Sequence, residues 1–348
     1  MKKLLAFLLI LTLIAGLAAC ANEPEVVEPD IPEELEIETP DAEAVPIFGS
    51  NINGALHRIE YGDNVVYLFG TLHGGRAQWY PLADVVEDAL RRADVLAMEV
   101  DLTDTETLED AVMDAMFLPD GQTWADFLPQ EAYEHLIEVA SLYGLSYEES
   151  NTIHPTVLVT LITLELAQEL AVNFEMTTEI GSVGVDGYLA GIALELGLPI
   201  IGLESIEQQV DIAYNPPLDV VIAQVMHLLP PDEMIEAILE NMTMDQMADC
   251  YEANNFNALN RGFAQELDPQ SDRADLIYMR EMVSNWRSTY YATEIARLLQ
   301  ETEEPTTFFV AVGLSHVIRS GAGDGFTDIV EQLALLNIRA VPVQAISL

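Results

Sequence analysis

Beyond residue 50, the pattern of apolar and polar positions divides the chain into short buried strands and longer amphipathic helices. The expected strands cover 55–60, 64–69, 95–100, 199–203, 307–312 and 339–345. The expected helices cover 82–92, 106–117, 130–143, 155–171, 185–196, 207–213, 218–229, 232–241, 244–254, 272–299 and 326–336. The first two strands predict a hairpin across 61–63. The order of elements predicts an α/β fold: a mixed or parallel central sheet flanked by helices, with a large helical insertion over about 104–180 and further helices over about 206–300.

Two of the expected strands run directly into the same short motif. The first ends in Gly70-Thr71-Leu72-His73 and the second in Gly313-Leu314-Ser315-His316, 243 positions later. Glycine permits the backbone to turn after a buried strand, so each histidine follows a strand's carboxyl end. Ligand crevices of open α/β sheets form at that edge. The pattern therefore predicts one shared site containing both imidazoles, against the alternative that two of six histidines follow buried strands by chance.

The N-terminus indicates export. Lys2 and Lys3 precede an apolar stretch over 4–18 that is too short for a stable transmembrane helix, and small residues then lead to Cys20. The segment 1–19 resembles a bacterial lipoprotein signal, which implies cleavage before Cys20 and lipidation of its thiol. An ordinary secretory signal with an incidental cysteine is the alternative. Residues 20–46 are rich in Glu, Asp and Pro, which predicts an extended tether ahead of a domain over 47–348.

The charge of the chain restricts its chemistry and its partners. Both lysines lie in the signal, so the mature chain has 11 arginines against 59 Asp and Glu, and 11 minus 59 gives a net charge of −48. The absence of lysine excludes Schiff-base chemistry and a P-loop. Such a charge repels nucleic acid and attracts cationic peptides. A solvated coat for solubility is the simpler explanation for most of it.

Several segments together resemble the TraB/PrgY/GumN family, which includes the animal TIKI proteases. The resemblance covers nearly all of residues 50–348 and rests on segments 67–73, 80–82, 93–99, 184–189, 197–205 and 310–316. It implies a divalent metal site formed by His73, His316 and Glu99, with Zn²⁺, Mn²⁺ or Co²⁺ as the cofactor. Neutral imidazoles and a carboxylate suit these ions, which activate water for hydrolysis. A structural salt bridge is the alternative role for Glu99.

Three further residues are candidates for the same site. Glu204 follows the strand 199–203, and Glu99 lies at the end of the strand 95–100; Glu204 is expected to act as ligand, general base or orienting partner. Asp186 opens a helix after a glycine, where N-capping competes with a role in substrate binding. Arg280 aligns with an arginine that the family places on its long helix, where it would pair with a site carboxylate or a substrate carboxyl. A surface ion pair is the alternative for Arg280.

Two functions follow from these features. The first is a metal-dependent peptidase acting on extracytoplasmic peptides, with Glu99 or Glu204 accepting the proton of the attacking water. The second is a non-enzymatic surface lipoprotein that sequesters a peptide signal or a metal-bearing ligand such as haem. Both imply a protein anchored by lipid on the outer side of a bacterial membrane, with a peptide or protein, and no nucleic acid, as partner.

Overall fold

The computed structural model describes residues 50–176, 180, 181, 183–266, 271–318 and 325–343. The expected signal, Cys20 and the tether lie outside the described residues. Among the helices that are described, none combines the length and the apolarity needed to cross a membrane.

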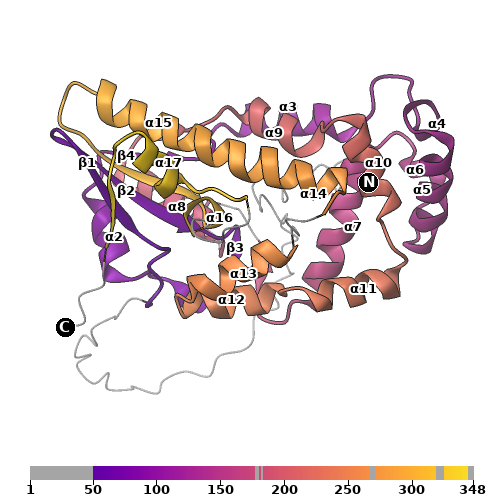
Figure 1. Ribbon diagram of the computed structural model, residues 1–348, viewed down its shortest axis with the longest axis horizontal. Coiled ribbons are helices and arrows are strands. Elements are labelled where there is room, and N and C mark those ends of the chain that lie inside the picture. The colour runs from indigo at the N-terminus through magenta and orange to yellow at the C-terminus, as the bar shows by residue number, and fades with distance from the viewer. Residues whose placement is uncertain (1–49, 177–179, 182, 267–270, 319–324, 344–348) are drawn as a thin grey trace, which may run out of the picture.

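A mixed sheet of six strands forms the centre of the fold, as predicted (Figure 1). Its order is β6 (Ile200–Gly202), β4 (Val95–Met98), β7 (Thr307–Gly313), β2 (Asn64–Thr71), β1 (His57–Tyr61) and β8 (Ala340–Pro342). The first four strands of this order are parallel. β1 pairs antiparallel with β2 as the expected hairpin, and with β8 at the edge. The four parallel strands therefore end at one common edge.

The strand residues alternate between two hydrophobic cores. Phe308, Val310 and Val312 of β7 pack on one side of the sheet, with α15 (Arg287–Glu301) and α17 (Ile329–Leu335). Phe309 and Ala311 pack on the other side, where the larger core includes α2 (Asp84–Arg91) and α8 (Val185–Leu196). Every residue from 308 to 312 is buried, as expected for a parallel strand covered on both faces.

The long middle of the chain is helical. Its remaining helices are α3 (Thr105–Met116), α4 (Trp124–Phe127), α5 (Gln130–Leu142), α6 (Tyr147–Ser150), α7 (Pro155–Leu170), α9 (Ile206–Tyr214), α10 (Leu218–Met226), α11 (Pro231–Glu240), α12 (Met244–Glu252), α13 (Phe256–Glu266) and α14 (Ala274–Tyr278). Helices α4 to α7 gather with α10 and α11 at the end of the molecule away from the sheet, at the right of Figure 1. Two smaller helices are η1 (Ala77–Trp79) and α16 (Ser315–Ile318), which contains His316.

The structure differs from the sequence expectations in several elements, among them four short helices that were not expected, η1, α4, α6 and α16. Helix α13 was not expected, because the asparagines at 254, 255, 257 and 260 are typical of turns. A second small sheet pairs β3 (Gly74–Gly75) with β5 (Glu175–Met176), directly after His73. The helix expected over 272–299 is three consecutive helical segments, because α14 and α15 are joined by a π-helix over Met279–Trp286.

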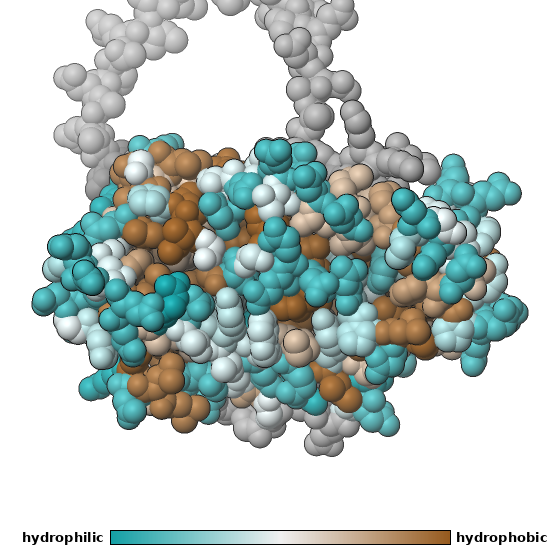
Figure 2. Space-filling view, turned by 90° about the horizontal axis from the view of Figure 1, so that it is seen from above, coloured by the Kyte–Doolittle hydropathy of each residue, from teal (hydrophilic) through white to brown (hydrophobic). Residues whose placement is uncertain are grey.

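The surface is largely hydrophilic. Seen from above, hydrophilic residues spread over the molecule and hydrophobic residues form separate patches between them (Figure 2). Half of the chain is apolar, so the acidic side chains cover a well-packed interior.

Candidate functional site

The two Gly-x-x-His motifs lie at the ends of neighbouring parallel strands, at the same edge of the sheet. β2 and β7 are neighbouring parallel strands, and their last residues, Thr71 and Gly313, are register partners. The backbone N–H of Leu314 donates to the carbonyl of Thr71 at 2.8 Å, which ties the two turns together. Gly70 allows this close approach, because a Cβ at that position would lie 2.5 Å from Cδ1 of Leu314.

Glu99 enters the site from β4, the neighbour of β7 on its other side. Its Oε1 accepts a hydrogen bond from the backbone N–H of Gly313 at 2.7 Å and lies 4.0 Å from Nε2 of His316. Its Oε2 accepts hydrogen bonds from Gln209 at 2.9 Å and from Nη2 of Arg287 at 2.7 Å. The carboxylate is thus buried and paired, and it contacts the second histidine.

Glu204 occupies the equivalent position after β6 and shares Arg287 with Glu99. Its Oε1 accepts hydrogen bonds from Arg287 Nε at 3.0 Å, from Arg287 Nη2 at 2.5 Å and from the Tyr291 hydroxyl at 2.6 Å. Arg287 also contacts the Tyr291 hydroxyl directly. Along the edge of the sheet, the site residues therefore follow the strand order β6, β4, β7, β2 as Glu204, Glu99, His316 and His73.

The two glutamates have opposite pKa shifts. Burial alone would raise the pKa of Glu99, but the attraction of Arg287, His316 and His73 outweighs it and lowers the pKa to about 2. Burial raises the pKa of Glu204, since its attraction to Arg287 only partly compensates and Glu99 repels the charged form. The site thus holds one firmly ionised carboxylate and one that protonates more readily.

Arg287 is the functional residue that the sequence reasoning missed. The structure places Arg287, and not the expected Arg280, against the two glutamates; the side chain of Arg280 pairs with Glu281 at 3.0 Å. The π-helix immediately precedes Arg287, and π-helical turns rotate the following side chains relative to an α-helix. One signal was present in the sequence: Ser284, Arg287 and Ser288 form a polar stripe at helical spacing, and all three are buried.

Each histidine is held by a partner on its Nδ1 atom. His73 Nδ1 lies 3.1 Å from Oδ2 of Asp186, in the first turn of α8, and His316 Nδ1 lies 2.9 Å from the hydroxyl of Ser288. Gly184 is the N-cap of α8, so the Asp186 carboxylate serves the histidine instead of the helix end. Desolvation lowers the pKa of His73, but the Asp186 and Glu99 carboxylates outweigh it and raise the pKa to about 9.

A small cavity opens beside these groups. Its volume of about 20 Å³ is enough for roughly one water molecule. The residues that line it are His73, Met98, Glu99, Val100, Leu102, Asp186 and Gln209. The side-chain oxygen of Gln209 is buried there and has no hydrogen-bond partner in the described part of the protein. A polar ligand in this cavity would satisfy that oxygen.

The donor set suits a divalent cation in its chemistry. Two imidazoles and a carboxylate follow neighbouring strands at this sheet edge, and a hydrogen bond on Nδ1 is an arrangement that orients the Nε2 of a histidine toward a metal. Within the described ranges, however, no group of three or more His, Cys, Asp or Glu side chains is arranged to hold an ion. Glu99 is bound instead by Arg287, Gln209 and Gly313.

Comparison with known proteins gives one match. No curated protein and no solved structure shows significant similarity to the chain. The model of the TraB/PrgY/gumN family matches residues 55–322, a span that includes both Gly-x-x-His motifs, both glutamates and Arg287. This protein therefore belongs to the TraB/PrgY/gumN family.

Proposed function

We propose that this protein is a metal-dependent hydrolase, a peptidase in which His73, His316 and Glu99 hold a Zn²⁺, Mn²⁺ or Co²⁺ ion. The observation that carries the proposal is the pairing of the two histidines. They follow adjacent parallel strands, and each has a hydroxyl or carboxylate partner on Nδ1, which leaves Nε2 available for a metal. This arrangement of both histidines supports a metal site over two unrelated structural histidines.

Each residue of the proposed site has a distinct role. When bound, the cation supplies a water molecule of lowered pKa and polarises the peptide carbonyl. Asp186 and Ser288 fix the two imidazole rings, and Arg287 holds the Glu99 carboxylate in place by a hydrogen bond to its Oε2. Both oxygens of Glu99 accept hydrogen bonds, whereas Oε2 of Glu204 is buried and has no partner among the described residues. We therefore assign proton acceptance to Glu204. Glu99 stays the proposed carboxylate ligand because its Oε1 lies 4.0 Å from Nε2 of His316.

The substrate we propose is an extracytoplasmic peptide, with cationic sequences favoured. The support is the net charge of −46 of the full chain, which attracts positive peptides over a Debye length of roughly 8 Å at physiological salt. The preference for cationic peptides should therefore fall as salt is added.

We further propose that lipid on Cys20 anchors the protein outside the cytoplasm. Labelled fatty acid should enter the wild type and not Cys20→Ser, and equal labelling of both would refute the anchor.

The proposed peptidase activity and metal binding are tested with a peptide library and matched histidine variants. Protein purified without chelator is analysed for metal content, and peptide products of the wild type, His73→Ala, His316→Ala and His227→Ala are compared by mass spectrometry. His227 is exposed, and its Nδ1 lies 2.7 Å from the carbonyl oxygen of Ala223 in its own helix, so its variant is the control. We expect both site variants to lose cleavage and metal, and the control to keep both. Identical product profiles in all four proteins would refute the peptidase, and saturable binding of peptide or haem without cleavage would favour the sequestering lipoprotein.

A further inference from the structure

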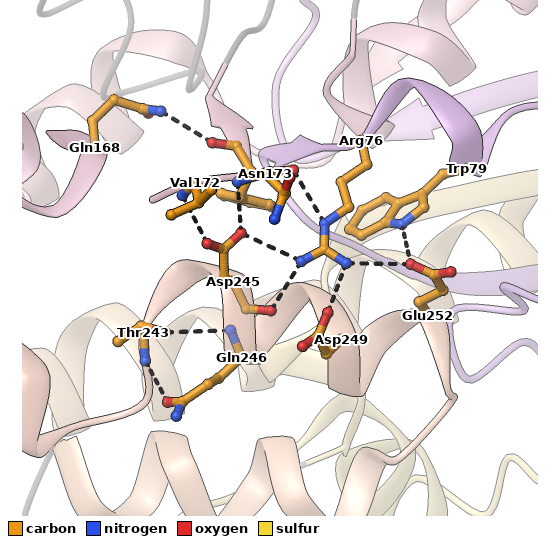
Figure 3. Close-up of polar contacts among 11 residues, drawn as sticks. Arg76, Trp79, Gln168, Val172, Asn173, Thr243, Asp245, Gln246, Asp249 and Glu252 are labelled. Atoms are coloured by element: carbon orange, nitrogen blue, oxygen red, sulfur yellow. Dashed lines mark hydrogen bonds and ion pairs between the residues drawn. The ribbon is translucent and has the colours of Figure 1, made fainter. Parts of the chain in front are cut away.

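A buried arginine outside the site connects three separate parts of the chain. The side chain of Arg76 is 9% exposed and donates to carboxylates of α12 (Figure 3). Nη1 donates to Asp249 Oδ1 at 2.7 Å and to Glu252 Oε2 at 3.4 Å, and Nη2 donates to Asp245 Oδ1 at 3.3 Å. Its Nε donates to the carbonyl of Asn173 at 3.1 Å. One guanidinium thus binds α12 and the turn after α7 at once.

The partners of Arg76 are themselves joined into one network. Asp245 also accepts hydrogen bonds from the backbone N–H groups of Val172 at 2.7 Å and Asn173 at 3.0 Å. Glu252 accepts one from the indole N–H of Trp79 at 3.1 Å, three residues after Arg76. Figure 3 shows these side chains converging on the guanidinium from both sides. The segment 76–79 is therefore fixed to α12 at two points.

The charges around Arg76 make it hard to replace. No Lys or Arg occurs between Arg92 and Arg261, so the helices from α3 to α12 contain no basic residue of their own except histidine. Arg76 is the cation that pairs with the three carboxylates of α12. Without Arg76, these carboxylates would repel one another, and the 76–79 segment would keep only its Trp79 contacts with Glu252 and Tyr251.

The network lies immediately next to the first site histidine in the sequence. Between His73 and Arg76 are only the two residues of β3, Gly74 and Gly75, and both are tightly enclosed. A Cβ on Gly74 would lie 2.6 Å from the carbonyl oxygen of Glu175, and a Cβ on Gly75 would lie 2.7 Å from that of Val183. A displacement of Arg76 is therefore transmitted along a short, constrained segment to His73.

We infer that Arg76 is a positioning residue: by binding α12 and the turn at 172–173, it fixes the loop that presents His73 to the site. On the other side of His73, the N–H of Val185 donates to the carbonyl of Leu72 at 3.1 Å. The histidine thus lies between two anchors, and the guanidinium network is the downstream one. The effect of Arg76 on metal binding rests on the proposed function, but its effect on the position of the loop that contains His73 does not.

Hydrogen–deuterium exchange and imidazole NMR test the inference on the full chain. Arg76→Met removes the charge and Arg76→Lys keeps it, while Arg92→Met is the control because Arg92 and its partner Asp88 are both exposed. In Arg76→Met we expect exchange to rise by about tenfold or more in 72–79 and in 244–252, with β7 unchanged. The imidazole signal of His73, assigned with His73→Gln, should shift. Arg76→Lys should restore part of both effects, since it keeps the charge but loses the planar fork.

Two carboxylate variants keep the test decisive if Arg76→Met does not fold. Asp249→Asn and Glu252→Gln weaken the network from the side of α12, and they should raise exchange in 72–79 as well as in α12. Exchange raised in α12 alone, or an unshifted His73 signal in folded Arg76→Met, would overturn the inference.

Zn²⁺ titration completes the experiment. Weaker Zn²⁺ binding in Arg76→Met than in Arg92→Met supports the link between Arg76 and the proposed metal site. If the wild type binds no Zn²⁺, the proposed metal site fails, while the exchange data still decide the role of Arg76.

Discussion

Replacing Arg287 by methionine should strongly destabilise the metal-free protein. The substitution keeps much of the side-chain volume but leaves Glu99 and Glu204 without their shared cation, although both are buried. Breaking a buried pair by removing one partner costs about 3–5 kcal/mol. The pKa of Glu99 points in the same direction, because Arg287 is the largest of the attractions, ahead of His316 and His73, that hold this pKa below its usual range despite burial. We therefore expect a loss of about 3 kcal/mol at pH 7.

The pH dependence of this loss follows from the sign of the shift. A lowered pKa in the folded state stabilises the protein above pH 4.5, and this contribution is lost as the pH falls from 4.5 toward 2. Without Arg287, the pKa of Glu99 should be higher than in the wild type, because its largest attraction is lost while its burial remains, so acidification neutralises the unpaired carboxylate more readily in the variant. The difference in unfolding free energy between wild type and Arg287→Met should therefore be smaller at pH 4 than at pH 7.

Urea unfolding of chelator-treated protein at the two pH values measures this difference. Arg92→Met, which breaks only an exposed pair, is the control and should change stability by less than about 0.5 kcal/mol. Adding Glu99→Gln and Glu204→Gln to Arg287→Met should recover part of the loss, because the unpaired charges are removed. A loss below about 1 kcal/mol, or an equal loss at pH 4 and pH 7, would refute the reasoning.

Three further predictions concern other positions. Burial lowers the pKa of His154 from 6.5 to about 4, so the unfolded chain takes up a proton first and stability should fall by about 3 kcal/mol between pH 6.5 and pH 4; His154→Phe should flatten that part of the urea-unfolding profile, and an unchanged slope would contradict the assignment. Gly70→Ala should cost about 1–3 kcal/mol, measured by thermal unfolding, because the new Cβ meets Leu314 Cδ1 at 2.5 Å; a wild-type melting temperature would show that the turns can separate. Ser288→Ala removes the partner of His316 Nδ1 and should weaken Zn²⁺ binding about 10- to 100-fold by calorimetry, whereas exposed Thr289→Ala should leave it unchanged; equal affinities would exclude an orienting role for the hydroxyl.

The local sequence determined where the strands end and which side chains follow them. The buried run 308–312 with Gly313 defines both β7 and the position of His316, and the same logic holds for β2 and His73. Glu99 and Glu204 were also identified as residues following strands. These features are local, because burial on both faces requires a continuous apolar run and a turn requires glycine within a few residues.

The partners of those residues came only from the tertiary structure. Asp186 meets His73 across 113 positions and Arg287 meets Glu99 across 188, and no spacing rule connects residues that far apart. Arg280 was expected from the family resemblance, and only the packing of the long helix shows that Arg287 is the arginine that contacts the two glutamates. Likewise, Arg76 reads as a loop arginine until α12 is placed against it. The strand order decides which strand ends become neighbours, and long-range packing sets that order. The sequence therefore specified the two histidines and two glutamates at the strand ends, and only the fold specified their contacts and brought Arg287 to them.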